Sequence, residues 1–130
     1  MPTTSLSIYL HFVQTIEKFS AGATIIREGD SANCFYILEK GAVEIYVDET
    51  LLNVIMYPGS IFGEIAFASG KKRTGSIKAR TETTVRKYEC DNLEILISEH
   101  PDVAAMIIET LANRLTRTTE KLSELAKHLN

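Results

Sequence analysis

Short apolar segments separated by glycine fill the chain from residue 21 to residue 88. Residues 43–47, Val-Glu-Ile-Tyr-Val, alternate between an inward-facing and an outward-facing set, which is the period of a strand with one buried face. Further segments of β-forming character cover residues 23–26, 34–38, 51–57, 76–79 and 83–88. Because many short strands at this spacing are typical of sandwiches and barrels, the pattern predicts a mainly β domain with added α-helices.

Beyond Tyr88 the apolar period changes to about three and a half residues. Asp91, with Glu94 three residues on, indicates a capping box that opens a helix through about Glu99. His100-Pro101-Asp102 ends that helix and begins a second, since proline is favoured at the first helical position and an acid in the first turn. We expect this second helix to run to the end of the sequence.

The second helix carries an apolar heptad pattern interrupted by one threonine. Its a and d positions are Ile108, Leu111, Leu115, Thr118, Leu122, Leu125 and Leu129. The e flank is small (Ala112, Thr119, Ala126) and the g flank is basic (Arg114, Lys121, His128). The seam predicts a parallel homodimer through this helix, and the alternative is a single amphipathic helix lying on its own barrel. The predicted organisation is a helical N-terminal segment at residues 1–18, a β barrel at 19–90 and C-terminal helices at 91–130.

Composition places the 130-residue chain among ordinary globular proteins, with 45% hydrophobic and 24% charged residues. The net charge of −3 argues against general binding to nucleic acid. Cys34 and Cys90 lie far apart and no secretory leader precedes them, so we expect free thiols in a reducing cytoplasm. The apolar runs are far shorter than the ~20 residues of a membrane span, so we expect no membrane association.

The candidate chemistry lies in residues 62–75, FGEIAFASGKKRTG. Gly63 lets the backbone approach a ligand just before a short helical turn begins at Glu64, where free N–H groups attract anions. Arg73 lies nine residues after Glu64 and follows a glycine and two lysines, so the chain can loop back and bring the guanidinium to the same N–H groups. The Glu64 carboxylate would repel a phosphate but could accept hydrogen bonds from sugar hydroxyls. Together these residues indicate a site for a sugar phosphate. The alternative is a surface ion pair between Glu64 and Arg73, which would contribute little.

A resemblance to a known family adds to this interpretation. Gly63-Glu64-Ile65-Ala66 followed by Arg73-Thr74 resembles the phosphate-binding cassette of cyclic-nucleotide-binding domains, most closely that of the regulatory subunits of cAMP-dependent protein kinase. Residues 35–41 resemble the aromatic-rich strand of the family that ends in glycine, and residues 28–30 its preceding turn. The resemblance implies a β jelly-roll, or double-stranded β-helix, that binds cAMP or cGMP without turning it over.

The C-terminal helix resembles the dimerisation helix of the bacterial catabolite activator protein and its relatives, at residues 100–103, 111–115 and 118–122. The resemblance implies that Glu64 accepts from the ribose 2′-OH and that Arg73 pairs with the cyclic phosphate. Arg114 would reach the ligand side of the cassette near Glu64. Thr118 and Thr119 would bind the purine edge, Thr119 on the nucleotide held by the other subunit. The complete set of implied ligand-binding residues is Ile45, Val54, Gly63, Glu64, Ile65, Ala66, Arg73, Thr74, Arg114, Thr118 and Thr119.

Some positions depart from the family pattern. Gly75 stands where alanine is usual, which we expect to loosen the loop. Thr74 resembles kinase-type domains that select cGMP, although a hydroxyl residue also occurs there in cAMP-binding activators, so the base stays open. The sequence ends at Asn130 without the helix-turn-helix of the activators, and we therefore expect no direct DNA binding by this chain.

Other functions find less support in the sequence. A basic patch for nucleic acid would use Lys71, Lys72, Arg73, Lys78 and Arg80, too few charges in an acidic domain. His11, His100 and His128 do not cluster with Cys or acidic residues, so we expect no metal and no metal-dependent barrel enzyme. No serine or cysteine lies in a nucleophile motif, so we expect no enzyme. A ligand-free dimerisation module of the same fold remains the alternative function.

Overall fold

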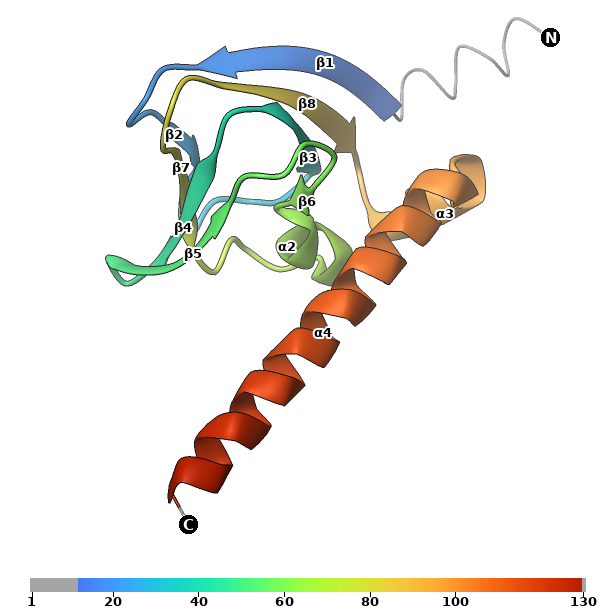
Figure 1. Ribbon diagram of the computed structural model, residues 1–130. Coiled ribbons are helices and arrows are strands. Elements are labelled where there is room, and N and C mark those ends of the chain that lie inside the picture. The colour runs from blue at the N-terminus through green and yellow to red at the C-terminus, as the bar shows by residue number, and fades with distance from the viewer. Residues whose placement is uncertain (1–11, 130) are drawn as a thin grey trace, which may run out of the picture.

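The computed structural model describes residues 12–129 and shows two four-stranded antiparallel sheets with helices at one end (Figure 1). One sheet has the strand order β1-β8-β3-β6 and the other β2-β7-β4-β5. The strands are β1 (Phe12–Phe19), β2 (Thr24–Ile26), β3 (Cys34–Lys40), β4 (Val43–Val47), β5 (Thr50–Ile55), β6 (Ile61–Phe62), β7 (Ser76–Ala79) and β8 (Thr83–Cys90). The predicted jelly-roll class with a long C-terminal helix is confirmed.

The helices begin close to where the sequence predicts them. They are α2 (Glu64–Ser69), α3 (Leu93–Glu99) and α4 (Pro101–Leu129). The cap of α3 is Asn92 and not Asp91, because the Asn92 side chain accepts a hydrogen bond of 2.9 Å from the backbone N–H of Ile95. The prediction of the capping residue is therefore wrong by one position, while the proline start of α4 is confirmed.

The N-terminal segment differs from its prediction. Residues 12–18 are expected to be helical, yet they form most of β1, which pairs with β8 along its whole length from Phe12↔Cys90 to Phe19↔Thr83. The strand satisfies its backbone groups through a partner some seventy residues away, and that long-range pairing overrides local preference. The rest of the predicted helix, residues 1–11, lies outside the described residues.

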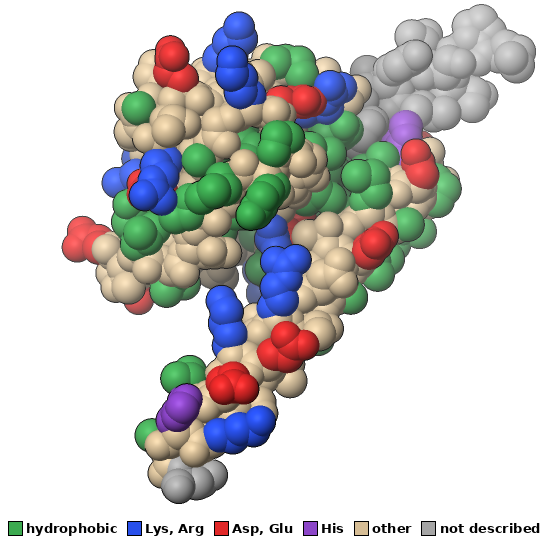
Figure 2. Space-filling model, in the orientation of Figure 1, with side chains coloured by type: hydrophobic (Ala, Val, Ile, Leu, Met, Phe, Trp, Pro, Cys, Tyr) green, Lys and Arg blue, Asp and Glu red, His purple; other side chains and the backbone are tan. Residues whose placement is uncertain are grey.

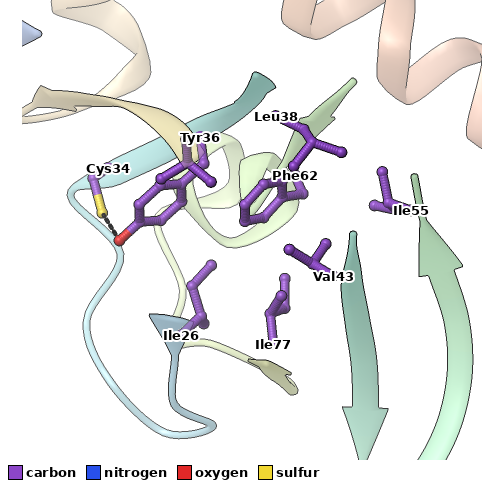
Figure 3. Close-up of a cluster of buried hydrophobic side chains, with 9 residues drawn as sticks. Ile26, Cys34, Tyr36, Leu38, Val43, Ile55, Phe62 and Ile77 are labelled. Carbon is purple, nitrogen blue, oxygen red and sulfur yellow. Dashed lines mark hydrogen bonds between the residues drawn. The ribbon is translucent and has the colours of Figure 1, made fainter. Parts of the chain in front are cut away.

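Two hydrophobic clusters hold the fold together. The first lies between the sheets (Figure 3) and contains Ile26, Cys34, Tyr36, Leu38, Val43, Ile55, Phe62, Ile77 and Val85. The second joins the barrel to the helices and contains Phe35, Ile61, Phe67, Tyr88, Cys90, Leu96, Ala104 and Ile107. Phe62 belongs to the first cluster and Phe67 of α2 to the second, so the segment between them is anchored at both ends.

Only the first half of α4 contacts the barrel. Ala104 and Ile107 are its buried residues, and the half-buried Arg114 still contacts Glu64 and the Ile61 carbonyl. Beyond Arg114 every described residue of α4 is exposed, and the helix runs away from the barrel (Figure 1). Of the five leucines of the predicted seam, Leu111 is partly buried against the second cluster, and the other four are exposed in the single chain: Leu115 by 68%, Leu122 by 62%, Leu125 by 61% and Leu129 by 86%. The alternative of an amphipathic helix covered by its own barrel does not describe this half of α4.

Candidate functional site

A cavity of about 100 Å³ opens where α2, β4 and the segment before β7 meet. The predicted residues that line it are Ile45, Gly63, Glu64, Ile65, Ala66, Arg73, Thr74 and Arg114. Sequence reasoning missed Ile26, Val47, Gly75 and Ile77, which also line it. Val47 could have been found from the strand period, because residues two apart on a strand face the same side as Ile45 does.

Position 63 requires glycine for two reasons, its backbone conformation and the atoms packed against it. Its φ of +76° lies in the left-handed region, where glycine carries no steric penalty. A Cβ at this position would lie 2.8 Å from Ile26 Cδ1 and 3.2 Å from Arg73 Nη1. Glycine therefore lets the Arg73 guanidinium lie directly against the start of α2.

Arg73 is a buried cation, 6% exposed, and it lines the cavity. Its Nη1 donates to the Gly63 carbonyl at 2.5 Å, and its Nη2 donates to the Cys34 carbonyl at 2.6 Å. These neutral acceptors fix the guanidinium without cancelling its charge, and in residues 12–129 it forms no ion pair with a carboxylate. Since arginine has five N–H donors, the fixed side chain can still bind an anion with the remaining ones.

Glu64 is a buried carboxylate, 1% exposed, at the start of α2. Its Oε2 accepts from Arg114 Nη1, while Arg114 Nη2 donates to the Ile61 carbonyl. Its Oε1 is buried and has no hydrogen-bond partner within the described part of the chain. Burial raises the pKa of Glu64, and the nearby Arg114 guanidinium acts in the opposite direction. The surface Glu64–Arg73 pair of the sequence alternative is not what the structure shows.

The structure does not bring every expected residue to the cavity. Val54 pairs with Glu44 on β4, so it lies on the opposite face of the sheet from Ile45, and we remove it from the proposed site. Thr118 and Thr119 are exposed on α4 and do not line the cavity of the single chain. The Thr118 hydroxyl donates to the Arg114 carbonyl at 2.9 Å within the helix.

The helix next to the site carries charges of both signs. Figure 2 shows Lys and Arg side chains where α4 passes the barrel, with Asp and Glu side chains beside them, and the described chain places Arg114, Arg117, Glu120 and Lys121 along this part of the helix. Within residues 12–129, no group of three or more His, Cys, Asp or Glu residues could hold a metal ion. Cys34 and Cys90 are free and buried, as expected. None of the described helices is both long and apolar enough to cross a membrane.

Comparison with known proteins identifies the family. Residues 16–100 match the model of the cyclic nucleotide-binding domain. The chain belongs to this family. It is 40% identical over 81 residues to the cAMP-dependent protein kinase regulatory subunit of Emericella nidulans, covering 62% of this chain and 20% of that protein. It is 28% identical over 116 residues to the cAMP-activated global transcriptional regulator CRP of Salmonella typhimurium, covering 85% of this chain and 55% of that protein.

The fold agrees with this assignment. The crystal structure of the Thermus thermophilus catabolite activator protein superposes with a TM-score of 0.71 at 24% identity, covering 97% of this chain and 60% of that one. The chain thus spans about half the length of the regulator relative and a fifth of the kinase relative. It is a cyclic nucleotide-binding domain homologous to both, and the resemblance drawn from the cassette and the C-terminal helix is confirmed.

Proposed function

We propose that this chain senses cAMP, or in second place cGMP, by binding it without turning it over. The observation that carries the proposal is the pair of buried charged side chains in one cavity. Arg73 is a fixed cation without a carboxylate partner among the described residues, and Glu64 offers a buried acceptor oxygen without a donor. A cyclic nucleotide supplies both complements, an anionic ring phosphate and a ribose hydroxyl donor.

Each residue then has a distinct role. Arg73 pairs with the cyclic phosphate, and Glu64 Oε1 accepts from the ribose 2′-OH while Arg114 holds Oε2. Ile45 and Ile65 provide apolar wall for the sugar and the base. The names of both relatives refer to cAMP, which favours cAMP as the ligand of this chain, and Thr74 is the reason why cGMP stays the second candidate.

The proposal extends to the C-terminal helix. Arg114 belongs to α4 and contacts the same carboxylate that would accept the ribose hydroxyl, so ligand binding would act directly on α4. The exposed seam of α4 offers an apolar surface to a second copy of the chain. In such a homodimer Thr118 and Thr119 would contact the purine edge, Thr119 on the nucleotide of the partner.

Titration calorimetry with cAMP and then cGMP tests the function. Arg73→Ala should weaken binding by about 2–5 kcal/mol, because it removes a desolvated cation from the phosphate. Lys72→Ala is the matched control, since Lys72 is the exposed neighbour of Arg73 and lies outside the cavity lining, and it should bind as the parent does. Arg73→Lys keeps the charge but loses the planar fork, and an intermediate affinity would show that geometry contributes.

Two results would contradict the proposal. If the folded parent chain gives no heat of binding with either cAMP or cGMP, the ligand-free dimerisation module is favoured. Unchanged affinity of Arg73→Ala would show that the phosphate lies elsewhere.

A further inference from the structure

Strand β4 lies very close to the cassette at Gly75. A Cβ on Gly75 would lie 2.5 Å from the Tyr46 carbonyl oxygen and 3.1 Å from Val47 Cγ2. The nearer atom belongs to the backbone, so a methyl group could be admitted only if a strand moved. Gly75 does not have a positive φ, so its backbone conformation would accept other residues. Glycine is required here because a side chain would clash with β4.

The β4–β5 pair contains a bulge next to this point. Ile45 pairs with Asn53, but the next residue, Tyr46, pairs with Leu51, so Leu52 of β5 is the extra residue. A bulge of this kind bends the strand pair and increases its twist. The hairpin then closes through a tight turn with left-handed residues at positions 48 and 49. The bend lies at the place where the Tyr46 carbonyl meets Gly75.

The cassette cannot simply move away from β4, because its other side is held. The backbone N–H of Gly29 donates to the Arg73 carbonyl at 2.8 Å, and the Arg73 N–H donates to the Asp30 carbonyl at 2.8 Å. The Glu28 N–H donates to Ser76 Oγ at 3.0 Å, and Ser76 itself pairs with Tyr46. The segment from Arg73 to Ser76 is thus held between the loop at residues 28–30 and β4.

We propose that Gly75 is a positioning residue of the nucleotide site, which sets the distance between Arg73 and the wall formed by Val47. This inference rests on the proposed function. Gly75 admits the Tyr46 carbonyl, β4 therefore lies against the cassette, and Val47 of β4 lines the same cavity as Arg73. The nucleotide contacts Arg73 through its phosphate and Val47 on an apolar wall, and the position of this wall depends on the absence of a side chain at residue 75. A larger residue there would move Val47 away from Arg73 without removing any group that touches the ligand.

A double-mutant cycle tests the inference by titration calorimetry of the full chain with cAMP. Gly75→Ala should weaken binding about ten-fold through the displaced strand. Val47→Ala should weaken it several-fold, because part of the wall is removed. The double variant should bind no more weakly than Gly75→Ala alone, since a wall already displaced has no further contact to lose.

Gly22→Ala is the matched control for lost stability. Nothing lies within 4 Å of a Cβ at Gly22, but its φ of +87° makes alanine strained there, so the variant should unfold more easily while the affinity of the folded protein stays unchanged. If Gly75 had only a structural role, Gly75→Ala would likewise lower the stability and leave the affinity of the folded protein for cAMP unchanged.

The outcomes separate this inference from the proposed function. Binding by the parent chain together with equal binding by Gly75→Ala, or losses that add in the double variant, would overturn the positioning role and leave the function standing. If Gly75→Ala does not fold, the test rests on Val47→Ala alone. An affinity of Val47→Ala for cAMP equal to that of the parent would then overturn the positioning role of Gly75. Absence of binding by the parent would overturn the function and the inference together.

Discussion

The barrel and the distal half of α4 contain the same apolar residue types, but the barrel buries them and the helix exposes them. Leu38 and Val43 in the barrel are 0% exposed, whereas Leu115 and Leu129 on α4 are 68% and 86% exposed. A rolled pair of sheets buries one face of every strand within a single chain. A lone helix beyond the barrel has no second surface to cover its seam. The difference teaches that the chain buries the core of its barrel by itself, while the seam of α4 needs a second surface to become buried.

The largest effect should come from comparing one leucine of each region. Leu38→Ala should lower the free energy of unfolding by about 2–5 kcal/mol, because it leaves a cavity between the sheets. Leu122→Ala, at a position 62% exposed, should leave the barrel intact and instead weaken self-association. Urea unfolding of each variant, with sedimentation over a range of concentrations, measures both quantities. A strictly monomeric parent chain at micromolar concentration would contradict the proposed homodimer.

An intermediate effect should come from the protonation of Glu64. Burial raises its pKa in the folded chain, so the Glu64 contribution to the free energy of unfolding is present at acid pH and is lost as pH rises through that raised pKa. Nucleotide binding should change in the opposite direction, because protonation replaces a charge-assisted acceptor by a neutral one, at a cost of about 1.5 kcal/mol. Affinity for cAMP measured from pH 7 downward should therefore fall.

Glu64→Gln is the control for this pH dependence. The variant cannot ionise, so its weaker affinity should stay flat over the same pH range. A parent profile as flat as that of the variant would show that Glu64 does not contact the ligand in its ionised form.

The smallest effect should come from α4. Replacing Thr118 and Thr119 by valine should reduce the preference between cAMP and cGMP by about 1 kcal/mol while leaving most of the affinity intact, because neutral hydrogen bonds to the base are lost and the phosphate contacts remain. Competition of the two nucleotides on the double variant measures the preference. Preserved discrimination would place base recognition in the barrel and remove Thr118 and Thr119 from the proposed site.

Local signals in the sequence were sufficient for several features of the fold. The two-residue period of Val43–Val47 predicted β4, and Pro101 predicted the start of α4, because each depends on residues adjacent in the chain. Residues 12–18 carried no comparable signal, since β1 exists through its pairing with β8. The same limitation explains why the face on which Val54 lies became clear only from its pairing with Glu44.

For the site, the sequence by itself determined which chemistry is present: a glycine, a carboxylate and an arginine within one short loop, in a pattern that identified the family. The tertiary structure alone decided how these groups are satisfied. Arg114, which the resemblance placed near Glu64, bonds Oε2 and leaves Oε1 without a partner among the described residues. Arg73 is held by carbonyls in place of a carboxylate, and the Tyr46 carbonyl of β4 fills the space beside Gly75. The physical reason is that residue types and local periods are properties of neighbours along the chain, whereas burial, hydrogen-bond partners and free space depend on segments that only folding brings together.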